Sequence, residues 1–311
     1  MPKCGGFLFS FRAMNYGKPA LNFAQQAAQL RARGLVAGSV ADIEARLRDV
    51  SYYRLSAYWH PFKQADDSLA PGTTLATVWR RYTFDRHLRL LVMDAVERVE
   101  IAVLRTRMVE QFAGRYGSFG HRQWKNFRPD FKPAEHTRLM LDIDQAAERS
   151  REVFIEHFRT KYTAEPHLPL WVAAEIMTFG QLFTFYRQLN RTEQQQLAAT
   201  FGVLPPVLES WLFTLNYIRN ACAHHARLWN RELPIRPLVP DQKHQPDWHT
   251  PSAPKNDRVY VVLLLLRHLM RDVAPRSQWT TRLHKLLADY PEIPLNLMGF
   301  PVNWTACPIW K

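Results

Sequence analysis

A short polar segment, RNACAHH at Arg219 to His225, holds the residue types best suited to chemistry. Histidine titrates close to neutral pH, so it can take a proton from a hydroxyl group or give one to a leaving oxygen. Arginine stays cationic and offers a planar fork of donors to a phosphate group as its charge develops. RNA supplies its own nucleophile in the ribose 2′-hydroxyl. The segment is therefore suited to RNA cleavage without a metal ion.

Helix geometry limits how one copy of this segment can act. Asn220 and His224 are four residues apart and share a helix face, whereas Arg219 and His224 are separated by about 140°. One helix cannot easily direct both side chains at a single phosphodiester, but two copies facing each other across a cleft can. Asn220 could orient the histidine or hold the backbone of the motif. The spacing therefore favours a homodimer.

Two other interpretations of the segment compete with catalysis. A metal site would use Cys222, His224 and His225, but adjacent histidines on a helix diverge by about 100°. No second cluster of Cys or His with ligand spacing exists elsewhere, so we expect no metal and no cofactor. The segment could also be the polar end of an ordinary helix, where arginine and histidine complement the dipole. Spacing alone does not decide between this interpretation and catalysis.

The composition indicates a folded, basic protein. The 311 residues are 47% apolar, which is enough for a substantial core in one large or two smaller domains. Lysine and arginine number 41 against 28 acidic residues, a net charge of +13. Such an excess favours phosphate contacts with counterion release. Nucleic acid is therefore the first candidate partner and a membrane surface the second.

The apolar runs and the cysteines favour the cytoplasm. The run VYVVLLLL is far shorter than the roughly 20 residues that a membrane span requires. Near the N-terminus, FLFSF is too short for a signal peptide. Cys4, Cys222 and Cys307 are odd in number and widely spaced, which fits free thiols better than disulfides. We therefore expect a cytoplasmic protein that does not span a membrane.

Helical periodicity dominates the chain and predicts a mainly α bundle with irregular connections. It is strongest in residues 83–112, where apolar residues recur three and four apart, and these should form a long central helix. No alternating strand pattern and no fixed repeat occurs. The other expected helices are 19–34, 40–50 with Ser39 as its cap, 134–161, 168–189 interrupted by Gly180, about 205–228 carrying the motif, 257–273, and 277–290.

The organisation along the chain predicts four parts. Residues 1–13 have two glycines and no helical period, so we expect a disordered or extended leader with Met14 as the true initiator. Residues 14–70 form an N-terminal helical segment, and residues 71–290 form the helical domain that carries the motif. Residues 291–311 form a proline-rich tail.

The motif and its surroundings resemble a known family. RNACAH matches the RNxxxH form of the signature of HEPN ribonucleases, with Arg219, Asn220 and His224 in the motif positions. The wider chain resembles the Abi family of phage abortive-infection proteins, of the AbiD and AbiF kind. That resemblance rests on five blocks in the family's order: KPALNFAQQAAQLRARGL, SYYRLSAYWHPF, YTFDRHLRLLVMDAVERVEIAVL, PLWVAAEIMTFGQL and LNYIRNACAHHARLWN.

The resemblance implies a HEPN-like helical bundle with additional N-terminal helices. It also implies metal-independent RNA cleavage at a composite site made of two motifs, and kinship to type VI CRISPR effector nucleases. Only one full motif occurs here, because Arg81 stands six residues before His87 and the intervening residues are aromatic and acidic. A homodimer is the simplest way to complete the site. Because an unrestrained nuclease is toxic, a regulatory non-coding RNA or a partner is a further expectation.

A basic and aromatic loop is the main candidate for RNA binding. Between Arg115 and Lys132, five cations face one carboxylate, with aromatic rings interleaved. Cations bind phosphates and rings stack on unpaired bases, although loop aromatics also anchor loops to a core. Arg54, in the aromatic block at residues 51–62, could likewise reach RNA or pair with an acidic neighbour. The candidate RNA-binding residues are Arg54, Arg115, Arg122, Trp124, Lys125, Arg128 and Lys132.

Two residues near the motif are candidates for catalytic support. Glu175 lies inside the apolar run WVAAEIM, where a buried helix disfavours a charge, so it should need a partner, for which Arg219 is attractive. His225 follows His224 and could touch RNA, although the motif does not require it. These expectations leave two functions: a HEPN-type endoribonuclease, or a non-catalytic module that holds a structured non-coding RNA or a partner.

Overall fold

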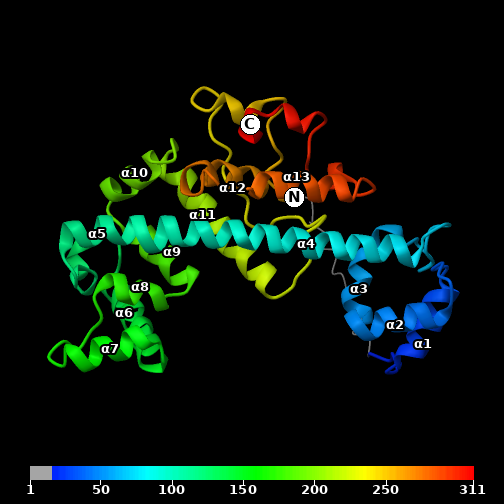
Figure 1. Ribbon diagram of the computed structural model, residues 1–311, viewed down its shortest axis with the longest axis horizontal. Helices are drawn as coiled ribbons and strands as arrows, with labels where there is room; N and C mark the ends of the chain where they lie inside the picture. The colour runs from blue at the N-terminus through cyan, green and yellow to red at the C-terminus, as the bar shows by residue number, and fades with distance from the viewer. Residues whose placement is uncertain (1–15) are drawn as a thin grey trace, which may run out of the picture. The chain divides into compact units, whose positions relative to one another are not determined.

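The computed structural model describes residues 16–311, and helices dominate them (Figure 1). Within that range there is no β-sheet, only isolated bridges between Val36 and Thr74 and between Lys63 and Leu69. The predicted mainly α class is therefore confirmed. The expected leader, the start at Met14 and Cys4 lie outside the described residues. The chain forms two compact units, an N-terminal unit up to Tyr82 and a C-terminal unit from Thr83.

The N-terminal unit contains α1 (Phe23–Ala32), α2 (Val40–Val50) and α3 (Tyr52–Trp59). Ser39 caps α2 as predicted, because its hydroxyl accepts from the Asp42 amide and the Asp42 carboxylate accepts from the Ser39 amide. In α1 the same arrangement, made by Asn22 and Gln25, starts the helix after Pro19. The helix therefore begins later than its proline suggested.

One continuous helical rod runs from Leu75 to Tyr116 and confirms the predicted long central helix. It consists of α4 (Leu75–Val99), a π-helical stretch η2 (Glu100–Met108) and α5 (Val109–Tyr116). The division between the two units falls inside α4. The apolar residues that predicted the rod lie on its buried side, among them Leu88, Val92 and Val103.

Two predicted helices are each broken in two. The polar helix expected at residues 134–161 is α6 (Pro133–Arg149) and α7 (Val153–Lys161). The apolar one is α8 (Leu170–Ile176) and α9 (Phe179–Gln188), with Thr178 capping α9. Arg105 of η2 fixes this second break, because its guanidinium donates to the carbonyls of Ala174 and Met177. The prediction that Gly180 interrupts the helix was wrong, since Gly180 lies within the first turn of α9.

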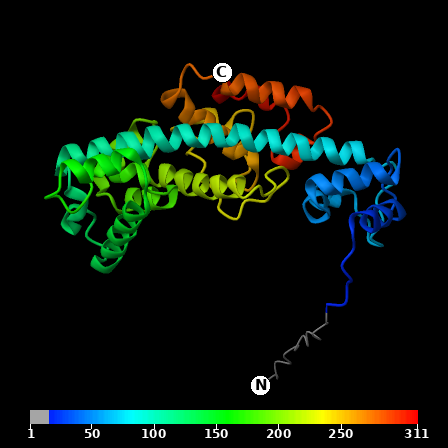
Figure 2. The same cartoon turned by 60° about the horizontal axis from the view of Figure 1, so that its bottom comes forward.

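The motif helix, α11 (Pro205–Ala223), lies among the other helices of the C-terminal unit. It contacts α9, α10 (Arg191–Ala199) and α12 (Val259–Val273). In Figure 2 the loop that follows it reaches α4, in agreement with hydrogen bonds between the two. The indole of Trp211 anchors α11, because its Nε1 donates to the Leu238 carbonyl at 2.9 Å.

The last part of the chain packs against the same unit. After α13 (Trp279–Asp289), residues 291–311 form short 3₁₀ turns rather than longer helices, and Ile309 and Trp310 at their end are buried. Ten of the 15 residues of the apolar α12 are buried, including every residue from Val259 to Leu266. None of the helices between residues 16 and 311 combines the length and apolar character that a membrane span needs.

Candidate active site

The motif stands at the C-terminal end of a rigid helix. α11 begins with Pro205 and Pro206, which suit a first turn because its amides have no partner within the helix. One side of the helix is buried from Val207 to Cys222. The helix ends at Ala223, five residues before the predicted end at 228. His224 is therefore a C-cap residue and does not lie within the helix.

A left-handed residue ends the motif helix. The amide of Ala226 donates to the Ala221 carbonyl at 2.8 Å, and that of His225 donates to the Cys222 carbonyl at 2.9 Å. These two bonds form a Schellman motif, which requires a positive φ at its turning residue. Here that residue is His225, with φ 56°, where glycine is more usual. The turn sets the position of His224 relative to the helix.

The three motif side chains face outward. Asn220 and His224 are exposed and Arg219 is half-buried. Within the described part of the chain, none of the three side chains makes a hydrogen bond or an ion pair. All three are thus available to a ligand that approaches the end of α11. No other described residue restrains the imidazole of His224 by a hydrogen bond.

Cys222 does not belong to this exposed group. It is buried on the inner side of α11, and burial raises the pKa of its thiol to about 12, with the carboxylate of Asp85 acting in the same direction. The thiol is therefore protonated at neutral pH and is no nucleophile. Cys222 and Trp229 both serve packing, because both side chains are buried. In residues 16–311 no three metal-binding side chains gather.

Glu175 is not the buried charge that the sequence suggested. It is exposed on α8, and no ion pair with Arg219 forms. The prediction was wrong because α8 buries only one side, through Leu170, Ala173 and Ala174. An exposed carboxylate stays solvated and needs no partner.

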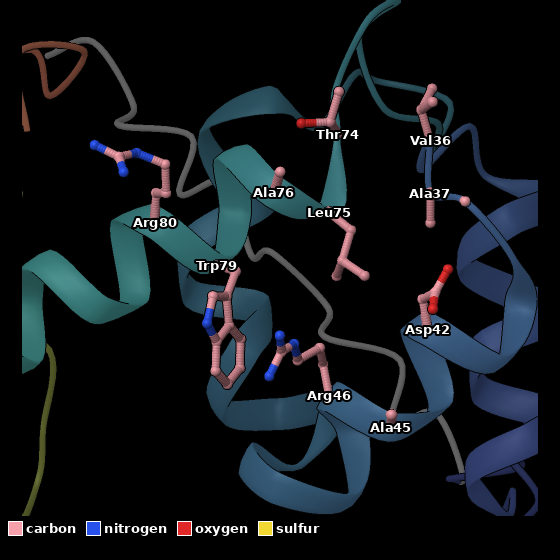
Figure 3. A pocket seen from close by; sticks show the side chains of 11 residues that line it. Val36, Ala37, Asp42, Ala45, Arg46, Thr74, Leu75, Ala76, Trp79 and Arg80 are labelled. Atoms are coloured by element: carbon pink, nitrogen blue, oxygen red, sulfur yellow. The ribbon is translucent and has the colours of Figure 1, made fainter.

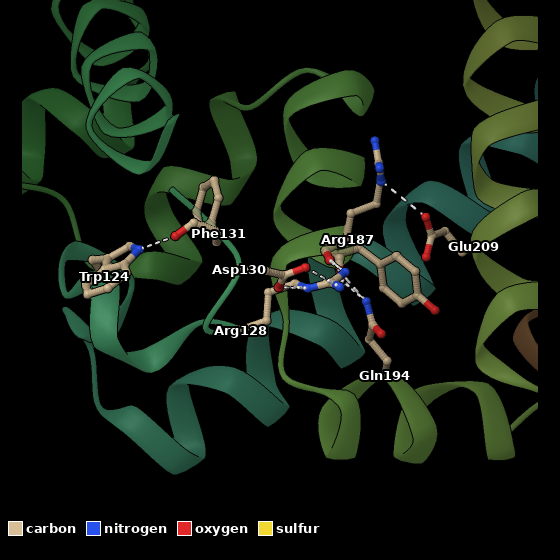
Figure 4. A network of polar contacts seen from close by, with 8 residues as sticks. Trp124, Arg128, Asp130, Phe131, Arg187, Gln194 and Glu209 are labelled. Atoms are coloured by element: carbon tan, nitrogen blue, oxygen red, sulfur yellow. Dashed lines mark hydrogen bonds and ion pairs between the residues drawn. The ribbon is translucent and has the colours of Figure 1, made fainter. Parts of the chain in front are cut away.

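The basic loop has fewer available cations than its sequence suggested. Arg122 makes a fork of hydrogen bonds to Asp144 at 3.0 and 2.8 Å. Arg128 is forked to Asp130 (Figure 4). Arg115 lies 3.4 Å from Glu193. Lys125 and Lys132 are exposed and no ion pair is recorded for either in the described chain.

The aromatic rings of the same loop divide between core and surface. Phe127 and Phe131 are buried and anchor the loop, as the structural alternative predicted. Trp124 is 40% exposed, and its indole donates to the Phe131 carbonyl (Figure 4). Trp124 is therefore the one candidate ring here that could offer an open face to a base.

The structure does not bring the basic loop to the motif. Arg128 and Asp130 share a cavity with Pro205 and Glu209 at the first turn of α11. From Glu209 to His224 the helix advances about 22 Å. Arg54 lies exposed on α3 in the N-terminal unit. Of the predicted residues, the structure gathers Arg219, Asn220, His224 and His225 at the C-terminal end of α11.

A cavity of about 730 Å³ in the N-terminal unit contains none of the predicted residues (Figure 3). Trp79 and Asp42 line it, and the guanidinium of Arg46 lies 4.1 Å from the centre of the Trp79 ring. Arg46 also pairs with Asp49 on α2 at 3.8 Å.

The sequence reasoning missed one residue beside the motif, Asp85 of α4. Its Oδ1 accepts from the amide of Leu228 at 3.0 Å and from that of Trp229 at 2.5 Å. Its Oδ2 pairs with Arg89, and the carboxylate is fully buried. The sequence did hold a sign of this residue. Asp85 and Arg89 lie with Leu88 on the apolar side of the long helix, where a charged side chain must be buried and needs partners.

Substitutions at His225 should distinguish a role of its backbone conformation from a chemical role of its imidazole. His225→Gly should keep both the fold and any cleavage, because glycine adopts a positive φ freely. His225→Val should destabilise the protein by about 1 to 2 kcal/mol relative to the glycine variant, since a β-branched residue is strained in the left-handed region. Thermal denaturation measures the difference. Loss of cleavage by a folded glycine variant would instead assign the imidazole of His225 a chemical role.

Comparison with known proteins gives one match. The family model described as Abi-like protein matches residues 45–230, more than half of the chain. The match ends directly after the turn that Asp85 holds, so it includes the whole motif. No curated protein and no solved structure matches the chain significantly.

Proposed function

Since the chain belongs to the family of Abi-like proteins, we propose that it is a metal-independent HEPN-type endoribonuclease acting in abortive infection against phage. The observation that carries the proposal is the exposed group of Arg219, Asn220 and His224 at the end of α11. In this proposal His224 moves the proton of the ribose 2′-hydroxyl or of the leaving 5′-oxygen. Arg219 stabilises the charge that develops on the phosphate, and Asn220 orients the site.

The interpretation of the motif as an ordinary helix end explains less. Dipole complementarity accounts for a histidine at the C-cap, because carbonyl groups there carry partial negative charge. It does not account for Arg219, which lies more than one turn earlier and makes no ion pair with a described carboxylate. A cation that is half-buried beside a solvent-facing Asn220 suits an incoming phosphate.

The direct test uses purified protein and end-labelled RNA in EDTA. The proposal expects cleavage to persist in the chelator and to leave 2′,3′-cyclic phosphate or its hydrolysis products. The non-catalytic alternative, favoured by the +13 charge, expects tight, salt-sensitive binding of a structured RNA without turnover. A discrete RNA that co-purifies would serve in this proposal as a regulator of the nuclease. Lys125, Lys132, Trp124 and Arg54 are further candidate contacts with RNA.

A composite site makes the activity depend on two copies of the chain. A HEPN-type site combines two motifs and this sequence carries one, so we infer that a homodimer presents two motifs to one phosphodiester and that both His224 side chains are required. Subunits of wild type and His224→Ala, mixed equally and allowed to exchange, should then retain about one quarter of the activity, because only pure wild-type dimers cleave. Retention of about one half would mean that each subunit acts alone.

A further inference from the structure

Asp85 is a buried carboxylate that the proposed chemistry does not use. Burying a carboxylate costs free energy unless it is both paired and hydrogen-bonded, and the protein supplies both. Arg89, one turn along α4, provides the positive charge, and the amides of Leu228 and Trp229 provide the hydrogen bonds. The result is an acceptor fixed in the core and directed at one short segment of backbone.

That segment begins directly after the motif. His224 is the C-cap of α11, and Leu228 follows it by four residues. The turn is held from the helix side by the bond from Ala226 to Ala221, and from the α4 side by Asp85. The buried side chains of Leu228 and Trp229 fill the space beneath it. Backbone contacts on both sides therefore determine where His224 stands.

Arg231, at the end of the loop, also contacts the motif helix. The guanidinium of Arg231 lies 5.3 Å from the centre of the Tyr217 ring on α11, and its Nη1 donates to the Arg227 carbonyl at 3.2 Å. Tyr217 lies two positions before Arg219. The bonds to Asp85 join the loop to a different helix, α4.

We propose that Asp85, held by Arg89, is the positioning residue of the motif. It fixes the turn after α11 and so sets the place from which His224 presents its imidazole to RNA. The inference rests on the proposed ribonuclease function. Asp85 is buried and touches no substrate, so it acts on the motif through the backbone at Leu228 and Trp229. A carboxylate suits this role because one oxygen can accept from two amides while the other pairs with Arg89.

Two substitutions of Asp85 remove its hydrogen bonds and its charge to different degrees. Asp85→Asn keeps an acceptor oxygen and the side-chain volume but loses the charge that pairs with Arg89. Asp85→Leu removes every acceptor and leaves two buried amides without their bonds. The matched control is Asp94→Asn on the same helix, because Asp94 pairs with Arg98 and Arg282 and does not contact the motif turn.

The experiment measures single-turnover cleavage in EDTA and RNA affinity, at a temperature where circular dichroism shows each variant folded. Hydrogen exchange in residues 224–230 and in α12 is followed in parallel. We expect the rate to fall about 10-fold in Asp85→Asn and about 100-fold in Asp85→Leu, as small misplacements of a reacting group do. Affinity for RNA should be unchanged. Exchange should accelerate in residues 224–230 but not in α12, and Asp94→Asn should match wild type in every measurement.

A purely structural role would leave the rate per folded molecule at the wild-type value, and that result would overturn the proposal. Unchanged exchange in residues 224–230 of either Asp85 variant would do the same. If Asp85→Leu does not fold, Asp85→Asn decides alone. A wild-type protein that never cleaves RNA removes the ribonuclease proposal and the positioning role with it. Active wild type together with a fully active Asp85 variant removes only the positioning role.

Discussion

Replacing His224 with alanine should lower the single-turnover rate of RNA cleavage by about 10² to 10⁴-fold, the range that a positioned general acid or base contributes. The fold should persist, because the imidazole is exposed and the bonds at this cap come from the backbone. The rate is measured with labelled RNA in EDTA, and thermal denaturation checks that the variant remains folded.

His157→Ala is the matched control for this substitution. His157 is an exposed histidine on α7 in the same unit. Its substitution removes the same kind of side chain at a position far from the motif in the sequence. It should cleave at the wild-type rate. A folded His224→Ala protein that cleaves as fast as this control would remove His224 from the mechanism.

Arg219→Ala should reduce cleavage by about 10² to 10³-fold, as the loss of one donor to a developing oxyanion does. Arg219→Lys should recover part of the rate, because lysine restores the charge but not the planar fork. The effect should fall mainly on the rate of the chemical step, since Arg219 is assigned to the transition state. The rate at saturating RNA reports the chemical step, and the separately measured affinity reports RNA binding, so the two measurements distinguish an effect on catalysis from an effect on binding.

The control for Arg219 is Arg236→Ala, which removes an exposed arginine beyond the motif turn. It should change neither the rate nor the fold. If Arg219→Ala weakens binding in a salt-dependent way and leaves the rate at saturation unchanged, Arg219 grips phosphate without catalysing, and the RNA-binding alternative gains its strongest support.

The long helix and the motif helix could be predicted because their apolar periods are extended and regular. The breaks within the other helices could not. Between α8 and α9 the chain turns because Thr178 caps the second helix and because Arg105, about 70 residues earlier, binds the carbonyls at the end of the first. The local sequence gives no sign of the contact with Arg105, and the only local indication of the break is a threonine in an apolar run.

The end of the motif helix was misplaced for a related reason. Helices commonly stop at a glycine in the left-handed conformation, and no glycine marks this turn. His225 adopts that conformation instead, since the segment that follows it is held at Leu228 by Asp85, which lies 143 positions before Leu228 in the chain. The prediction from sequence spacing therefore extended the helix to residue 228, beyond its true end at Ala223.

The motif residues could be found from the sequence, but the contacts that hold the turn after them could not. Arg219, Asn220 and His224 were recognisable by type and spacing, and the fold places them together on the surface. The charge count of the basic loop overstated its free cations, because a sequence shows charges and not their partners. Arg122 and Arg128 proved to be neutralised by Asp144 and Asp130. Asp85 was a single acidic residue in an apolar stripe, and only the fold identifies the two amides that it binds.

The central claim is that this motif cleaves RNA through the ribose 2′-hydroxyl, and a substituted substrate tests it most directly. The cleavage site of a short RNA is first mapped in EDTA with wild-type protein. The same RNA is then made with a single 2′-deoxynucleotide on the 5′ side of that bond, and cleavage there is measured. We expect this cut to disappear while the all-ribose RNA still yields a 2′,3′-cyclic phosphate end. Continued cleavage at the deoxy position, with 3′-hydroxyl and 5′-phosphate ends, would contradict it.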